Sequence, residues 1–198
     1  MGHFYEEKEM ANIDRTGFHV VANRFGSPYN GAVHKCFSTG DNLFKGDLVK
    51  WASDPVTSDE GVYLEVDRMT ATTELCVGVV VGWDANPDAL GNLYHAASGT
   101  NAVHIVYIQD VMLEAQDDAA SMVATDVGFN IDATFTAGST TTGQSGMELS
   151  GTSAATTAGL QFKIVQKAAK ADNTIAIANC GFYVTINQSG WIDQTAGV

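Results

Sequence analysis

Short segments that alternate apolar with polar residues recur along the chain from residue 17 onward. Turn-forming stretches rich in Gly, Asn, Asp and Pro separate them, of which 26–31 is the first clear example. Alternation with a period of two is typical of strands that bury one face. Short strands at fairly regular spacing predict an all-β, mainly antiparallel fold. The segments are 18–22, 46–51, 62–66, 75–81, 102–108, 111–115, 160–165 and 182–187.

The alternation also predicts which side chains face the core. Residues 75–81 are apolar on both faces, which favours a central strand covered on both sides. Three further segments should each bury one face. The expected inward residues are Val62, Leu64 and Val66, then Leu160, Phe162 and Ile164, and finally Phe182, Val184 and Ile186.

Composition along the chain divides it into three parts. Residues 1–16 are polar and mixed in charge and are expected to form an N-terminal arm; fraying is the alternative to a docked arm. Residues 17–108 predict a small β-barrel or sandwich, and residues 109–198 a second β-rich region. That region contains a Gly/Ser/Thr-rich stretch at 138–159, which is expected to be a long loop or peripheral hairpin that contacts something else.

Charge narrows the range of partners. The formal net charge is -13, and no Lys or Arg occurs between Met69 and Phe162, where ten Asp and Glu lie. Such a surface releases no counterions from phosphates, so neither nucleic acid nor an anionic membrane is an expected partner. A well-solvated surface with no charge-driven recognition is the simpler interpretation.

Cysteine usage and the N-terminal segment bear on where the protein is made. Cys36, Cys76 and Cys180 are odd in number and far apart, which favours folding in a reduced cytoplasm over a disulfide framework. The first ten residues lack the apolar region of a signal peptide, and the apolar run near 76–83 is too short to cross a bilayer. We therefore expect a protein that is neither exported nor membrane-spanning.

The motifs that catalysis requires are missing from the sequence. Gly143-Gln-Ser145-Gly has the wrong spacing for a nucleophile elbow, and no glycine-rich phosphate loop occurs. The five histidines include no i, i+4 pair for zinc, and His104 alternates within a strand as a structural residue would. Loop carboxylates such as Asp84 and Asp88 do not have EF-hand spacing. The sequence therefore predicts a protein that is not an enzyme and has neither metal nor cofactor.

The order of several short segments resembles that of tailed-phage capsid decoration (cement, head-stabilising) proteins. The correspondence covers roughly residues 17–190, and its weight lies in the order of its members. These are Gly46-Asp-Leu-Val49, Val77-Gly-Val-Val-Val-Gly82, Val111-Met-Leu-Glu-Ala-Gln116, Val127-Gly128, Thr142-Gly-Gln-Ser-Gly-Met147, Asp172-Asn173 and Val184-Thr-Ile-Asn187.

The resemblance implies a structural virion protein that stabilises the outer surface of a capsid. Its partners would be the major capsid protein and further copies of itself, as a homotrimer, and it would be made in the host cytoplasm. Contacts are expected from the arm, the loop and the C-terminal segment, through Phe4, Tyr5, Thr142, Gln144 and Trp191. The alternative is an adhesive or carbohydrate-binding module of a virion, a head fibre or tail component, with aromatics such as Trp51 and Trp83 lining a sugar surface.

Overall fold

The computed structural model describes residues 11–52, 54–58, 61–97, 99, 101–119 and 121–190. These residues form strands joined by turns and include no α-helix, which confirms the predicted all-β, mainly antiparallel fold. Two short 3-10 turns are present, η1 at Ile108–Asp110 and η2 at Ala124–Asp126. The strands are β1 His19–Asn23, β2 His34–Cys36, β3 Leu48–Trp51, β4 Val56–Ser58, β5 Gly61–Tyr63, β6 Val66–Arg68, β7 Gly78–Trp83, β8 Val103–Tyr107, β9 Val111–Gln116, β10 Asn130–Ile131, β11 Ala133–Thr134, β12 Glu148–Leu149, β13 Phe162–Lys167 and β14 Gly181–Ile186.

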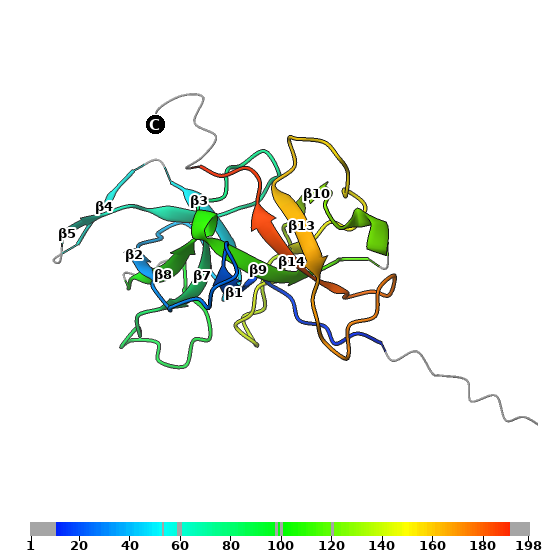
Figure 1. Ribbon diagram of the computed structural model, residues 1–198. Coiled ribbons are helices and arrows are strands. Elements are labelled where there is room, and N and C mark those ends of the chain that lie inside the picture. The colour runs from blue at the N-terminus through cyan, green and yellow to red at the C-terminus, as the bar shows by residue number, and fades with distance from the viewer. Residues whose placement is uncertain are drawn as a thin grey trace, which may run out of the picture.

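Two five-stranded sheets organise the molecule (Figure 1). The β7 sheet has the order β2-β8-β7-β3-β6, and the β14 sheet has the order β1-β9-β14-β13-β10. The chain passes from one to the other through η1, which joins β8 directly to β9. Strand β1 comes from the first half of the sequence but pairs with β9 of the second half. In this pairing His19 lies opposite Glu114.

The main core lies between these sheets, because alternate residues of the β7 sheet face the β14 sheet. Leu48, Val79 and Val106 are buried in one cluster with residues of β9, β13 and β14. Their sequence neighbours Val49 and Val80 point the other way and belong to a second cluster. Both faces of the β7 sheet are therefore buried, and β7 is its middle strand, as the two-sided apolar pattern of 75–81 predicts.

The second cluster is covered because the β7 sheet curls over it. The backbone N–H of Phe37 donates to the Leu64 carbonyl (3.3 Å), and the N–H of Val66 donates to the Phe37 carbonyl (2.8 Å). These bonds form one parallel bridge between the chain after β2 and the chain before β6, the two edges of the sheet. A single bridge does not close a barrel, so the architecture is sandwich-like.

The predicted buried faces of the C-terminal strands are confirmed except at Leu160, which precedes β13 and is only partly buried, and that of 62–66 is right only at Val66, which is fully buried. Phe162 and Ile164 in β13 are fully buried, as are the three inward residues of β14. Val62 and Leu64, by contrast, are 69% and 50% exposed. The chain leaves β5 at Tyr63 and enters β6 at Val66, so no single strand carries the alternation. Strand β5 pairs only with β4, in a hairpin that projects from the body and meets no core layer (Figure 1).

The Gly/Ser/Thr-rich stretch is also less peripheral than its composition suggests. Its two bulky apolar residues, Met147 and Leu149, are fully buried in the main core. The Met147 sulfur accepts the N–H of Leu48 (3.2 Å), and Leu149 pairs with Ala133 across β11 and β12. The small residues around them let the backbone lie close to its neighbours, so 138–159 is a packed part of the sandwich with exposed tips.

Candidate interaction surface

The structure brings together two of the five residues expected to make contacts. Thr142 and Gln144 are both exposed at the tip formed by residues 139–145. Phe4, Tyr5 and Trp191 lie outside the described residues. The tip of the Gly/Ser/Thr-rich stretch is therefore the part of the prediction from which a surface can be built.

Glycine fixes the position of this tip against two other segments. Gly143 has a left-handed φ of 72°, and a Cβ there would lie 2.0 Å from the Leu93 carbonyl oxygen. Its own carbonyl accepts the N–H of Lys45 (3.3 Å), and the Lys45 carbonyl accepts the N–H of Ser145 (3.0 Å). Only glycine permits this conformation and this approach, so the tip is held between residues 43–47 and the long β7–β8 connection.

A groove of about 420 Å³ runs beside the tip, and we call it the Trp83 groove. Trp83 is half-buried at the end of β7, packed against the second core cluster. The Lys45 ammonium lies 5.8 Å from the centroid of the indole ring, within the range of a cation–π contact. Leu93, 53% exposed, adds apolar surface. The lining residues are Lys45, Gly82, Trp83, Asn92, Leu93, Thr142, Gly143 and Gln144.

This combination is chemically suited to binding a side chain that is partly aromatic and partly anionic. A tryptophan face and a leucine offer desolvated apolar contact, while the exposed Lys45 offers a charge and the amides of Asn92 and Gln144 offer hydrogen bonds. Tryptophan is among the residues most enriched at the energetic centres of interfaces. The groove is thus the part of the surface best equipped for recognition.

Sequence reasoning missed Lys45 and Leu93 as members of this surface, and it named Trp83 only among the aromatics of the alternative, sugar-binding interpretation. The three come from segments about 40 and 10 residues apart in the sequence, and Trp83 by its isolation suggested a core residue. One signal was present, since Gly82-Trp83 ends an apolar strand at a turn, where a large aromatic is free to face outward. The pairing of that strand end with 142–144 depends on tertiary structure alone.

The next residue along the chain, Asp84, lies just beyond the end of β7 and pairs with one residue of β8 and one of β2. Its carboxylate lies 3.0 Å from the His104 Nε2 and 3.5 Å from the Lys35 ammonium. This cluster borders a wider groove of about 580 Å³ between the β4–β5 hairpin and the β7–β8 connection. His104, expected to be a structural histidine, is partly buried in an ion-pair cluster here, and the Asp84 carboxylate pairs with residues other than Lys45.

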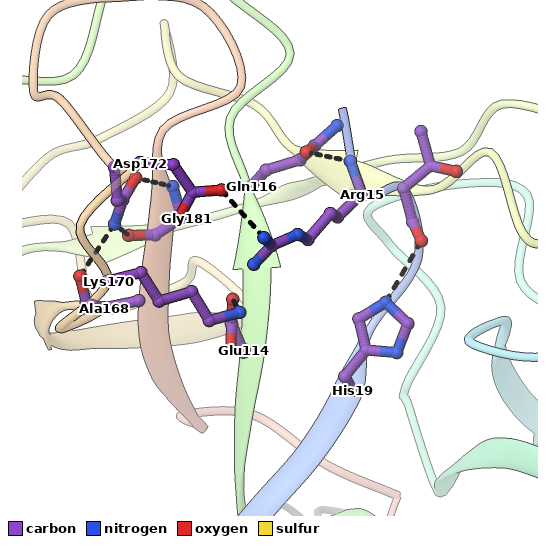
Figure 2. A network of polar contacts seen from close by, with 10 residues as sticks. Arg15, His19, Glu114, Gln116, Ala168, Lys170, Asp172 and Gly181 are labelled. Carbon is purple, nitrogen blue, oxygen red and sulfur yellow. Dashed lines mark hydrogen bonds and ion pairs between the residues drawn. The ribbon is translucent and has the colours of Figure 1, made fainter. Parts of the chain in front are cut away.

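A polar network fixes the segment that precedes β1 (Figure 2). The Arg15 guanidinium pairs with Asp172 (2.8 Å), its backbone N–H donates to Gln116 Oε1 (2.6 Å), and Lys170 pairs with Glu114. Nearby, the buried Asn12 side chain donates to the carbonyls of the 174–178 turn at 2.8 to 3.2 Å. The enclosed space is only about 20 Å³, room for one water, so the network is an anchor for residues 11–16 and not a ligand site.

The three thiols are buried and free of disulfides. Burial raises the pKa of Cys36 and of Cys180 to about 11 and that of Cys76 to about 12. Because the thiolate is the reactive form, these groups are poor nucleophiles at neutral pH.

Two kinds of feature are absent from the described residues. None of their helices is long and apolar enough to span a membrane. Within the same part of the chain, no three His, Cys, Asp or Glu side chains converge as a metal site requires.

Comparison with known proteins identifies no relative. No protein-family model matches the chain, no curated protein matches its sequence, and no solved structure matches it.

Proposed function

We propose that this protein is a structural, non-catalytic virion protein that decorates and stabilises the outside of a tailed-phage capsid. It would bridge subunits of the major capsid protein and associate with further copies of itself, as a homotrimer. The observation that carries the proposal is the order of seven short segments, which resembles the decoration type and in which each segment has a specific place in this fold.

The first of these segments supports the argument through its packing. Gly46 has φ +91°, and a Cβ there would lie 2.9 Å from the Gly17 Cα. The adjacent Asp47 is fully buried and accepts the Phe44 N–H (2.9 Å), which closes the turn into β3. The backbone conformation at this turn therefore depends on both residues, so the Gly-Asp pair is a feature of the fold.

The later segments act in the same way. Gly78 in β7 approaches the Val106 carbonyl so closely that a Cβ would lie 2.8 Å from it. Gln116 donates to Asp14 (2.8 Å) and to Glu148 (2.7 Å), and the buried Asn173 both donates to and accepts from the backbone of Gly181. A resemblance made of fold-determining positions supports a shared architecture, and the function follows from it by analogy.

Exposed apolar side chains at projecting positions support an assembling role. Phe25, in a turn closed by the bond from the Gly26 N–H to the Asn23 carbonyl (2.8 Å), is 97% exposed. Leu90 in the β7–β8 connection is 77% exposed, and Val62 in the projecting β4–β5 hairpin is 69% exposed. Large apolar groups held outward by ordered backbone favour contact with another protein surface. A capsid shell offers such contacts repeatedly, so each one needs only modest affinity.

Charge favours the outer surface of the shell over its interior. With a net charge of -13, the protein would be repelled by packaged DNA. On the exterior, the same charge keeps unattached copies soluble.

The location of the protein tests this proposal. Particles purified on a density gradient should contain the chain in a fixed ratio to the major capsid protein, and antibody labelling of intact particles should decorate their outside. Recovery of the chain only from the host-cell fraction, with none in the particles, would contradict the proposal.

A second candidate, an adhesive or carbohydrate-binding module, is favoured by one observation. Trp83 stands beside the amides of Asn92 and Gln144 in the Trp83 groove, an arrangement that allows a sugar ring to stack and to be hydrogen-bonded. A glycan array probed with the full chain tests this function. Specific binding that Trp83→Ala abolishes and Phe25→Ala leaves unchanged would favour it over decoration.

A further inference from the structure

We propose that the Trp83 groove receives the N-terminal residues Phe4 to Glu7 of a second copy of this chain. The inference rests on the self-association that forms one part of the proposed function, and not on binding to a shell. It assigns to that association a specific groove, a specific segment and a head-to-tail geometry.

Charge and shape complementarity carry the first step. The segment reads Phe4-Tyr5-Glu6-Glu7, two aromatic residues followed by two carboxylates. The groove offers Trp83 and the half-exposed Leu93 to the aromatics, and the exposed Lys45 ammonium to a carboxylate. Aromatic residues pair favourably with an indole face, and a carboxylate beside Lys45 replaces solvent with an opposite charge.

The local electrostatics favour this position for the segment. Lys45 is the cation among the lining residues, and the loops that complete the groove come from 69–162, where no Lys or Arg occurs. The carboxylate next to Trp83 in the sequence, that of Asp84, pairs with His104 and Lys35 and is not among the lining residues. An anionic segment therefore meets a positive charge in this groove, whereas the loops around the groove carry none.

The path of the chain indicates that the segment comes from another copy. Residues 11–17 run along the β14 sheet to the loop between β13 and β14, where Asn12 is anchored in the 174–178 turn (Figure 1). The chain thus reaches residue 11 at the end of the molecule away from the β7 sheet. From Ala11 to Phe4 the chain spans seven residues and reaches up to about 25 Å, enough to cross to a neighbour in contact with this end.

The contact is heterologous, because a segment of one copy meets a different surface of the next. Repetition of such a contact closes a ring if the rotation permits, and a three-membered ring would give the homotrimer. Anchoring at Asn12 and Arg15 shortens the free part of the segment, which raises its effective concentration at the neighbouring groove.

Charge reversal tests the pairing. The mass in solution would be measured by light scattering over a range of concentrations for the full chain, for Lys45→Glu, and for Glu6→Lys combined with Glu7→Lys. The control is Lys163→Glu, an exposed cation on β13 of the other sheet. We expect the wild type and the control to associate alike, and each reversal at the groove or the segment to raise the dissociation constant at least tenfold.

Mixing the two reversed proteins gives the decisive result. Each then carries a segment that suits the groove of the other, so the mixture should recover association through contacts between unlike chains, which are two of the three contacts in a mixed three-membered ring. A monomeric wild type, equal effects of Lys45→Glu and Lys163→Glu, or a mixture that stays monomeric would each overturn the inference.

Shell binding is measured separately. A protein that associates as expected but ignores capsid shells would remove the decoration function and leave this inference standing. A monomer that binds shells would remove the inference alone.

Discussion

Two buried aspartates are the residues whose chemistry departs most from that of an exposed side chain. Asp47 and Asp117 are both fully buried. One oxygen of each accepts a backbone N–H, from Phe44 (2.9 Å) and from Cys180 (2.8 Å), and the other has no hydrogen-bond partner among the described residues. Loss of hydration raises the pKa of both carboxyls from 3.8 to about 6.

These pKa values predict that the protein is more stable in mild acid than at neutral pH. A carboxyl with a raised native pKa binds its proton more tightly when folded. Its stabilising contribution is therefore complete below pH 3.8 and is lost as the pH rises through about 6. Between pH 4.5 and 7, each carboxyl should lower the free energy of unfolding by about 2 kcal/mol. Urea denaturation at these two pH values measures the difference.

Asp47→Asn separates this effect from the general titration of an acidic protein. The amide is neutral at both pH values, so the variant should lose the part of the pH dependence that Asp47 contributes. Asp110→Asn, at an exposed position, is the matched control and should behave as the wild type does. An unchanged pH dependence in Asp47→Asn would show that Asp47 does not titrate in this range.

Among the elements, β7 is the middle strand of its sheet and contributes to both core clusters. Its Val79 faces the main core and Val80 the second cluster. Strand β13, by contrast, exposes Val165 to solvent at 41%. The same substitution in these two strands therefore distinguishes a buried position from a surface position.

Val79→Asp should prevent folding, because it places an unpaired charge in a fully buried strand. Val79→Ala, which is expected to fold, should lower the free energy of unfolding by about 2 kcal/mol through the cavity it leaves. Val165→Asp and Val165→Ala should each change it by less than about 0.5 kcal/mol. Chemical denaturation followed by circular dichroism measures all four, and equal losses at the two sites would contradict this assignment of the core.

The predicted arm divides into two parts that deletion can separate. Removal of residues 1–15 eliminates Asn12 and Arg15, whose bonds tie the segment to the 174–178 turn and to Asp172. Such bonds are worth about 1 kcal/mol each, so this deletion should lower the melting temperature by several degrees. Removal of residues 1–10 keeps every one of these bonds, so it should leave the melting temperature unchanged at a protein concentration where the full chain is monomeric. Equal melting temperatures for the two truncations would show that the anchor adds no stability.

The elements also show which features the sequence determines locally. The alternation of Phe182, Val184 and Ile186 identified a buried face because one regular strand carries all three. The same pattern failed at Val62 and Leu64, since a turn and a bridge to Phe37 interrupt it and no layer covers the hairpin. The exposure of Thr142 and Gln144 was predictable, because they lie in a long stretch of small residues. That Lys45, Trp83 and Leu93 lie beside this stretch was not predictable, because tertiary pairing alone joins them to it.

At the scale of the whole molecule, a rigid sandwich presents its least regular segments outward. The sheets bury a continuous core, while the β4–β5 hairpin, the β7–β8 connection and the 139–145 tip carry exposed apolar or recognition residues. A decoration protein requires this division between a stable body and contact-making extensions. The acidic surface adds a prediction of its own, since attachment to a less acidic shell should depend on pH and on salt.

Co-sedimentation with capsid shells tests the central claim most directly. The purified full chain would be mixed with empty shells of candidate tailed phages, pelleted, and measured across a range of protein concentrations. The proposal predicts saturable binding at a fixed number of copies per capsid subunit, and shells that then withstand higher temperature. A chain that stays in the supernatant at every concentration, with shell stability unchanged, would contradict the claim.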